Sequence, residues 1–269
     1  MGPMRLVATD LDGTIVRPDG SISARTVAAL RACQQAGVDV VYVTGRPPRW
    51  LADVVAQTGQ AGTAICANGA IVYDLTKGEV LSASTLERDA TLEAADRVAR
   101  ALPGTTFAVE TISAGFRREP DYRARYDVGA DDSPAPLDEL VRDGDVVKLL
   151  CRNESSTGDV MLEAARPVLD GLASPTHSNQ RDCLIEVSAI GVSKAATLAQ
   201  LAGSRGIGPA DVVSFGDMPN DIEMLSWAGQ GYAMTGGHPD AVAAADQTAP
   251  ACIDDGVAQV LERLLSLRA

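Results

Sequence analysis

The sequence predicts an α/β protein whose core is a doubly wound parallel sheet interrupted by a long α+β insert. Three observations support this fold class. Short apolar runs alternate with helical segments in the first third of the chain and again in the last third, which is typical of a parallel sheet with helical crossovers. The middle of the chain lacks this alternation and contains a polar stretch, rich in arginine and proline, at residues 115–136. A length of 269 residues fits two domains or one domain with a large insert.

The first third contains three predicted strands separated by two predicted helices. The strands are the apolar or β-branched runs at residues 5–9, 38–43 and 64–67. Ser23 is a suitable N-cap for a helix over residues 24–36, where apolar side chains recur at helical spacing, and Gly37 ends that helix. A second helix is predicted over residues 49–57. The alternation predicts right-handed crossovers between parallel strands.

The last third repeats the alternation and completes the same sheet. Strands are predicted at residues 212–215 and 231–234, and helices at residues 193–204, 221–227, 239–244 and 256–267. The insert is predicted to contain strands at residues 106–110, 145–151 and 183–187 and helices at residues 91–101 and 158–169. We therefore divide the chain into a core of residues 1–81 and 186–269 and a cap of residues 82–185. Linkers near residues 81–85 and 185–189 are predicted to join them.

The balance of charge excludes several classes of protein. The chain has 36 acidic and 23 basic side chains and a net charge of −13, so nucleic-acid binding is not expected. Any site for an anion must be locally cationic, because the whole molecule repels anions at long range. No apolar run is long enough to span a membrane, and the first residues lack the pattern of a secretory leader.

The cysteines and histidines bear on the compartment and on structural metal sites. The five cysteines are an odd number, are widely spaced and include no CxxC pair, and the chain has two histidines. A disulfide framework and a structural zinc site are therefore not expected. These features predict a cytoplasmic protein. Both a monomer and a homodimer are compatible with the sequence.

The chemically active side chains cluster directly after predicted core strands. The first strand is followed by Asp10-Leu11-Asp12-Gly13-Thr14, the second by Thr44-Gly45-Arg46, the third by Asn68-Gly69, and the strand at 212–215 by Gly216-Asp217-Met218-Pro219-Asn220-Asp221. Lys194 lies at the start of the first helix after the insert. Ligands of open parallel sheets bind at the carboxyl ends of the strands, so we expect these side chains to share one site.

Four carboxylates at one site require compensation. If Asp10, Asp12, Asp217 and Asp221 lie together, each raises the pKa of the others. A hard divalent cation resolves this conflict, and Mg²⁺ accepts one or two carboxylates together with waters and a phosphate oxygen. The hydroxyl of Thr44, nearby backbone N–H groups and the ammonium of Lys194 suit the other oxygens of a phosphate. The predicted cofactor is therefore Mg²⁺.

Asp10 and Asp12 have the spacing needed for two different chemical tasks. A carboxylate such as Asp10 can attack phosphorus and form an aspartyl-phosphate. Gly13 begins a turn, so Asp12 can reach the leaving group, protonate the departing oxygen and later accept a proton from the attacking water. Phosphoryl transfer depends mostly on positioning and on neutralisation of charge, and this set of residues supplies both.

These motifs resemble those of the haloacid dehalogenase (HAD) superfamily over essentially the whole chain. The segments at residues 10–14 and 44–46 resemble its motifs I and II. Gly191-Val192-Ser193-Lys194 is similar to motif III, and residues 216–221, followed by Ile222-Glu223-Met224-Leu225, are similar to motif IV. The triplet Asn68-Gly69-Ala70 and the length of the insert resemble the Cof-type branch, subfamily IIB, which has a C2B cap.

The resemblance implies a role for each matching residue. Asp10 would be the nucleophile and Asp12 the acid/base. Mg²⁺ would be held by Asp10, by the backbone carbonyl of Asp12 and by Asp217, with Asp221 supporting the metal and its waters. The predicted phosphate or substrate contacts are Leu11, Thr44, Gly45, Arg46, Asn68, Lys194 and Asn220. Two positions depart from the family pattern, namely Ala195 where glycine is frequent and Gly236-Gly237 where an Asn-Ala pair is usual.

The residues leave alternatives open at several positions. Arg46 suits either a substrate contact or an ion pair with a carboxylate at the sheet edge, and Asn68-Gly69 is also an ordinary turn sequence. In the insert, two clusters of polar side chains are candidates for binding the leaving group of the substrate. One consists of His177, Asn179, Arg181 and Glu186, and the other of Arg117, Arg118, Arg123 and Arg125.

The function favoured is Mg²⁺-dependent hydrolysis of a small phosphomonoester through an aspartyl-phosphate. The resemblance implies a sugar phosphate or a phosphorylated cofactor or precursor as substrate. One alternative is a phosphomutase or phosphotransferase on the same scaffold, in which a second hydroxyl replaces water as the acceptor. Another is a non-catalytic, phospho-regulated binding module like a receiver domain. The chain is about twice the length of a receiver, and a second acid beside the phosphoacceptor favours turnover.

Overall fold

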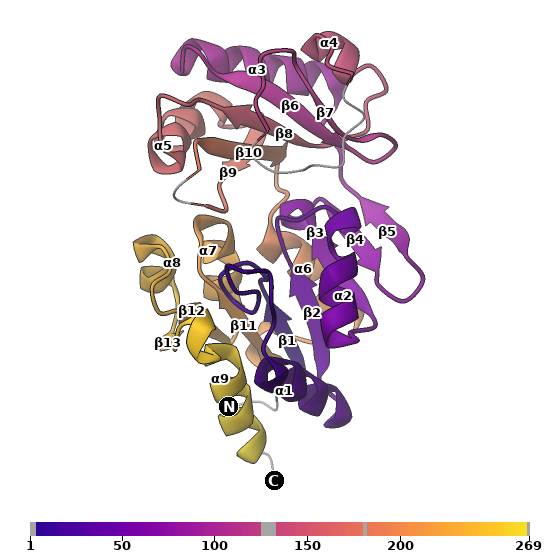
Figure 1. Cartoon of the computed structure of the whole chain (residues 1–269), viewed down its shortest axis with the longest axis vertical. Helices are drawn as coiled ribbons and strands as arrows, with labels where there is room; N and C mark the ends of the chain where they lie inside the picture. Colours follow the sequence, from indigo (N-terminus) through magenta and orange to yellow (C-terminus); the bar gives the residue numbers. More distant parts are fainter. Residues whose placement is uncertain (1–3, 125–132, 180–181, 268–269) are drawn as a thin grey trace. The chain divides into compact units, whose positions relative to one another are not determined.

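A computed structural model of the chain describes residues 4–124, 133–179 and 182–267. The chain divides into two compact units (Figure 1), which are described separately below. The first unit consists of the segments up to Ser82 and from Ser193 onward, and the second runs from Ala83 to Val192. Residues near 185–189, predicted to form a linker, belong to strand β10 (Leu184–Ala189) of the second unit.

The first unit is built on a mostly parallel sheet with the order β13-β12-β11-β1-β2-β3-β4-β5. The strands are β1 (Leu6–Thr9), β2 (Asp39–Val43), β3 (Thr63–Cys66), β4 (Ile71–Asp74), β5 (Glu79–Ala83), β11 (Val212–Gly216), β12 (Gln230–Met234) and β13 (Gln247–Ala249). Neighbours from β13 to β3 are parallel, whereas β4 is antiparallel to β3. Strand β1 pairs with β2 on one side and β11 on the other, so the strand order reverses beside it. The predicted doubly wound core is confirmed.

Helices cover both faces of this sheet, as an α/β fold requires. They are α1 (Ala24–Gln35), α2 (Ala52–Thr58), α6 (Lys194–Ser204), α7 (Ile222–Trp227), α8 (Pro239–Ala244) and α9 (Gly256–Ser266). Alternate side chains of β1 and β2, such as Leu6 and Val41, pack with Leu198 of α6 and Met224 of α7. Helices α1 and α9 pack against each other (Figure 1). The Ser23 hydroxyl accepts a hydrogen bond from the Thr26 amide and caps α1, as predicted.

The second unit is an α+β module with an antiparallel sheet in the order β7-β6-β8-β10-β9. Its strands besides β10 are β6 (Thr106–Thr111), β7 (Gly115–Arg118), β8 (Val146–Arg152) and β9 (Ala173–Thr176), and its helices are α3 (Arg88–Ala101), α4 (Leu137–Leu140) and α5 (Gly158–Leu169). Val98 of α3 and Met161 of α5 pack with Val109, Leu149 and Ile185 from one face of the sheet. The unit therefore has a hydrophobic core of its own.

The structure differs from the sequence-based expectation at several short elements. The predicted helix over residues 49–57 is a 3-10 turn at Pro48–Trp50 followed by α2, because Pro47 and Pro48 limit the backbone at its start. Strands β4, β5, β7, β9 and β13 were not predicted. They are sheet-edge or near-edge segments with polar residues, and Pro175 in β9 is tolerated because β9 is an edge strand. Among the described helices, none combines the length and apolar character that crossing a membrane requires.

Candidate active site

The carboxyl ends of β1, β2, β3 and β11 bring the predicted side chains to one edge of the first unit's sheet. Asp10 directly follows β1 and its amide donates to the carbonyl of Phe215 in β11 (2.9 Å). Thr44 directly follows β2, and its carbonyl accepts from the amide of Asn68 (3.0 Å), just beyond β3. Residues that are far apart in the sequence are therefore adjacent because their strands are parallel neighbours.

Lys194 is buried between two carboxylates. Its Nζ lies 2.6 Å from Oδ1 of Asp10 and 2.6 Å from Oδ1 of Asp221. Lys194 is the first residue of α6, and the side chain of Ser193 caps that helix by accepting from the amide of Ala196 (3.2 Å). The cap sets where α6 begins and so aims the ammonium at the sheet edge.

The site carries more negative charge than Lys194 can balance. Burial raises the pKa of Asp10 to about 7, although the nearby ammonium of Lys194 opposes the shift. Burial raises the pKa of Asp217 to about 9, and the charges of Asp10 and Asp221 add to this effect. Burial acts to lower the pKa of Lys194, but the two carboxylates outweigh it, so this pKa is raised. A second cation would relieve the remaining repulsion.

The donor set fits Mg²⁺. Carboxylate oxygens of Asp10, Asp217 and Asp221 all lie within 4.8 Å of one another. Oxygen donors with excess negative charge suit a hard divalent cation. The hydroxyl of Thr14 also lies 3.4 Å from Oδ1 of Asp217. Asp10 and Asp217 are the side chains best placed to hold such an ion.

Asp221 braces the loop that carries Asp217. Its Oδ2 accepts hydrogen bonds from the backbone amides of Asp217 and Met218, each at 3.0 Å, while its Oδ1 accepts from Lys194. Its side chain is completely buried. Asp221 therefore supports the site chiefly by fixing the loop and Lys194.

Gly13 and the Gly236-Gly237 loop allow close packing around Asp217. Gly13 has a φ of +80°, and a Cβ there would overlap the carboxylate of Asp217. A Cβ on Gly237 would press against the backbone of Asp217, whose carbonyl accepts from the amide of His238 (2.7 Å). The loop in which the chain departs from the family pattern thus contacts Asp217 through backbone groups.

Leu11 and Thr44 have structural contacts within their own turns. The Leu11 side chain is buried, and its carbonyl accepts from the amides of Ile15 (2.9 Å) and Val16 (2.7 Å), which closes the turn after β1. The buried hydroxyl of Thr44 accepts from the amide of Arg46 (3.1 Å), two residues on and just past Gly45.

Arg46 forms a two-point ion pair with Asp12. Its Nε donates to Oδ2 of Asp12 (2.8 Å) and its Nη2 to Oδ1 (2.6 Å). The sequence left open whether Arg46 binds substrate or forms an ion pair with a carboxylate. In this structure it forms the ion pair, with Asp12. Asp12 is the predicted acid/base, so Arg46 contacts a residue proposed to take part in the chemistry.

The turn at Ala67–Gly69, which follows β3, contacts both helix α6 and the loop after β11. Asn68 accepts from the side-chain amide of Asn220 through Oδ1 (3.0 Å). The carbonyl of Gly69 accepts from the hydroxyl of Thr197 (2.7 Å), and a Cβ on Gly69 would overlap the carbonyl of Ser193. Sequence reasoning missed Thr197 and the packing of Gly69. An Asn-Gly pair after a buried strand was the available signal.

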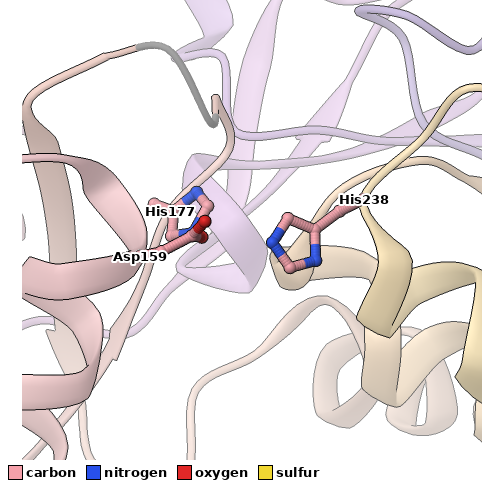
Figure 2. Close-up of side chains that lie close together, drawn as sticks. All are labelled: Asp159, His177 and His238. Atoms are coloured by element: carbon pink, nitrogen blue, oxygen red, sulfur yellow. The ribbon is translucent and has the colours of Figure 1, made fainter.

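The candidate residues of the insert form contacts within the second unit. Lys148 Nζ lies 2.5 Å from Oε1 of Glu186, whose Oε2 accepts from Ser178 (3.1 Å). Nε2 of His177 lies 2.8 Å from Oδ1 of Asp159 (Figure 2). Arg118 donates to the carbonyl of Tyr122 (3.2 Å). Arg125 and Arg181 lie outside the described residues. His238, also labelled in Figure 2, caps α8 of the first unit through Nδ1.

Comparison with known proteins places this arrangement in a family. The family model for haloacid dehalogenase-like hydrolases matches residues 7–261. An HMP-PP phosphatase of Cronobacter sakazakii is 30% identical over 89% of this chain and 87% of its own length. A Bacillus subtilis 5-amino-6-(5-phospho-D-ribitylamino)uracil phosphatase is 28% identical over 96% of this chain and 94% of its own length.

Solved structures agree with the fold. A sugar phosphatase of HAD subclass IIB superposes with a TM-score of 0.80 at 21% identity, covering 96% of this chain and 98% of that one. The match to the family model spans nearly the whole chain and includes every motif from Asp10 to Asp221. The chain therefore belongs to the haloacid dehalogenase-like hydrolases, as its motifs predicted, and is a HAD-type phosphatase.

Proposed function

We propose that the protein hydrolyses a small phosphomonoester in a Mg²⁺-dependent reaction through an aspartyl-phosphate on Asp10. The observation that carries the proposal is the position of Asp10, at the end of the central strand β1, with Lys194 Nζ 2.6 Å from its Oδ1. Lys194 holds one carboxylate oxygen and leaves Oδ2 to attack phosphorus. Nucleophilic carboxylates of this kind split hydrolysis into two easier steps.

The residues around Asp10 supply the remaining functions. Asp10, the backbone carbonyl of Asp12 and Asp217 would hold Mg²⁺, which, when bound, neutralises charge on the carboxylates and on the phosphate. The Lys194 ammonium and the Asn220 side chain are proposed to hold phosphate oxygens, with Thr44, Gly45 and Leu11 contributing through their turns. Asn68 positions Asn220.

The proposed reaction has two displacements at phosphorus. In the first, a bond forms from Asp10 to phosphorus, the ester P–O bond breaks, and Asp12 gives its proton to the departing oxygen. In the second, water attacks the aspartyl-phosphate, Asp12 accepts a proton from that water, and Asp10 and inorganic phosphate are released. Asp12 thus ends the cycle in its starting state.

We assign this chemistry to the first unit, the segments up to Ser82 and from Ser193 onward, because every residue named in it belongs there. The second unit, from Ala83 to Val192, is proposed as the cap, and it includes β10, which the predicted boundary at residues 185–186 would divide. The names of relatives support a sugar phosphate or a phosphorylated cofactor or precursor as substrate. A cytoplasmic location, a monomeric or homodimeric state and the lack of nucleic-acid or membrane partners complete the proposal.

The test is phosphate release from a panel of phosphorylated sugars, cofactors and cofactor precursors, with Mg²⁺ and with EDTA. We expect metal-dependent release that Asp10→Asn lowers by at least about 10³-fold, because the variant keeps the size of the side chain and removes the nucleophile. Near-full activity of Asp10→Asn would contradict the covalent mechanism. An isomeric sugar phosphate with little free phosphate would instead indicate a mutase.

A further inference from the structure

The two-point contact between Arg46 and Asp12 lies wholly within the first unit. Both carboxylate oxygens of Asp12 accept from the same guanidinium, at 2.8 Å and 2.6 Å. This fork geometry fixes the plane of a carboxylate as well as its distance, which a single contact does not do. Asp12 needs such a constraint, because 58% of its side chain is exposed, whereas the exposed fraction of Arg46 is 21%.

Arg46 is itself held in place from several directions. Its backbone amide donates to the hydroxyl of Thr44 (3.1 Å), and its carbonyl accepts from the amide of Ala67 (3.0 Å). Its Nη1 donates to the carbonyl of Trp50 (3.3 Å). The backbone of Arg46 is therefore tied to the ends of β2 and β3 and its guanidinium to Trp50, so the group that contacts the exposed carboxylate of Asp12 is itself fixed.

We propose that Arg46 is a positioning residue that orients the carboxylate of Asp12 for proton transfer. The inference rests on the proposed function, in which Asp12 is the acid/base. An exposed aspartate at the start of a turn has several side-chain rotamers, and the fork selects one of them. Proton transfer depends on heavy-atom distances of about 2.6–3.2 Å, so loss of this orientation slows the steps that use Asp12.

The test compares Arg46→Met and Arg46→Lys with the wild type on two leaving groups. A phosphorylated sugar has an alkoxide leaving group that needs a proton, whereas p-nitrophenolate leaves without one. For Arg46→Met we expect kcat on the sugar phosphate to fall about 100-fold with KM changed less than about threefold. Arg46→Lys, which keeps the charge and one contact, should restore part of kcat.

The two steps can be separated with p-nitrophenyl phosphate. In Arg46→Met, we expect the first burst of p-nitrophenolate to keep its rate while the following steady state slows, because hydrolysis of the aspartyl-phosphate still needs Asp12 as the base. Phosphoenzyme should therefore accumulate. A purely structural role of Arg46 would slow the burst and the steady state together.

Arg25→Met is the matched control. Arg25 forms the same fork with Glu262, at 2.9 Å and 2.6 Å, between helices α1 and α9. Removing that fork should leave both rates within about twofold, since a surface ion pair contributes little to stability. Circular dichroism of all three variants checks that each one folds.

Three outcomes would overturn the inference. A rise in KM with kcat unchanged would show that Arg46 binds substrate. An Arg46→Met enzyme with wild-type rates would show an ion pair without a catalytic consequence. If the wild type released no phosphate from any substrate, the proposed function and this inference would fail together, whereas an active wild type with an unaffected variant would overturn the inference alone.

Discussion

At the scale of single residues, the buried carboxylates make the metal-free site sensitive to pH. The pKa of Asp10 is raised to about 7 and that of Asp217 to about 9, chiefly by burial, from an ordinary value of 3.8. Both groups bind protons more tightly in the folded protein than in the unfolded chain. By linkage, their contribution to stability is complete below about pH 4 and is lost as the pH rises through about 7 and then 9.

The first prediction follows from this loss of stability with rising pH. In EDTA, the melting temperature should be lower at pH 9 than at pH 6, because both carboxylates must ionise while buried. Mg²⁺ should raise the melting temperature more at pH 9 than at pH 6, because protons no longer compete for the ligands. Thermal denaturation at the two pH values, with Mg²⁺ and with EDTA, measures both effects.

Asp217→Asn is the control for the pH effect. The variant removes the carboxyl with the higher pKa and keeps its size, so the stability of the metal-free protein should depend less on pH. It should also gain less from Mg²⁺. A variant whose melting temperature falls as steeply as that of the wild type between pH 6 and 9 would assign the effect to other groups.

The sequence predicted which residues follow the strands of the sheet, but it did not predict which side chains they contact. Asp10, Thr44, Asn68 and Asp217 follow apolar runs, so their common edge is a consequence of parallel pairing. The contact of Arg46 with Asp12 depends on the shape of the turn after β1. The hydrogen bonds of Asp221 likewise depend on a backbone loop, which side-chain chemistry alone does not specify.

At the scale of elements, the turn at Ala67–Gly69 packs between the end of β3 and the start of α6 and sets the distance between them. Ala67 and Asn68 have positive φ values of 50° and 56°, and Gly69 has a φ of +105°. This strained backbone places the Gly69 carbonyl against the hydroxyl of Thr197. Because α6 begins with Lys194, the position of the turn sets the position of the ammonium.

The second prediction concerns Gly69→Ala. The new Cβ would overlap the carbonyl of Ser193, so α6 must shift, and the positive φ adds strain. We expect a destabilisation of about 2 kcal/mol or more, from the penalty of a positive φ plus the overlap, and a loss of activity as Lys194 moves from Asp10. Urea denaturation and phosphate release measure the two effects.

Gly20→Ala separates strain from overlap. Gly20 also has a positive φ, of 81°, but a Cβ there would meet nothing within 4 Å. We expect a smaller destabilisation, about 1 kcal/mol, and unchanged activity. Equal effects of the two substitutions would show that contact with α6 contributes nothing.

Strands and helices could be predicted from the sequence where a run of buried apolar side chains defines them. Strands such as β2 and β11 are almost wholly apolar and buried, and their positions were confirmed within a residue or two. Strand β7, with the sequence GFRR, and strand β9, with the sequence ASPT, have no such signal, and pairing with neighbouring strands holds them in the sheet.

At the scale of the whole molecule, the net charge of −13 opposes the approach of an anionic substrate. The third prediction is that, at saturating Mg²⁺, kcat/KM rises about twofold or more as KCl increases from about 10 to 150 mM, because salt screens this repulsion. The value of kcat should stay constant, since it reports events after binding. A steady fall in kcat/KM with salt would show that the local cations outweigh the global charge.

The central position of β1 also bears on how the protein is made. Asp10 and Lys194 are separated by 184 positions in the chain, yet β1 pairs with β11, a strand that follows the entire insert. While the ribosome is still translating the insert, one edge of β1 has no strand to pair with. The insert, whose strands and helices are contiguous, can fold first. A nascent chain therefore lacks Lys194, Asp217 and Asp221, and with them a complete candidate site, until the segment that follows the insert has been synthesised.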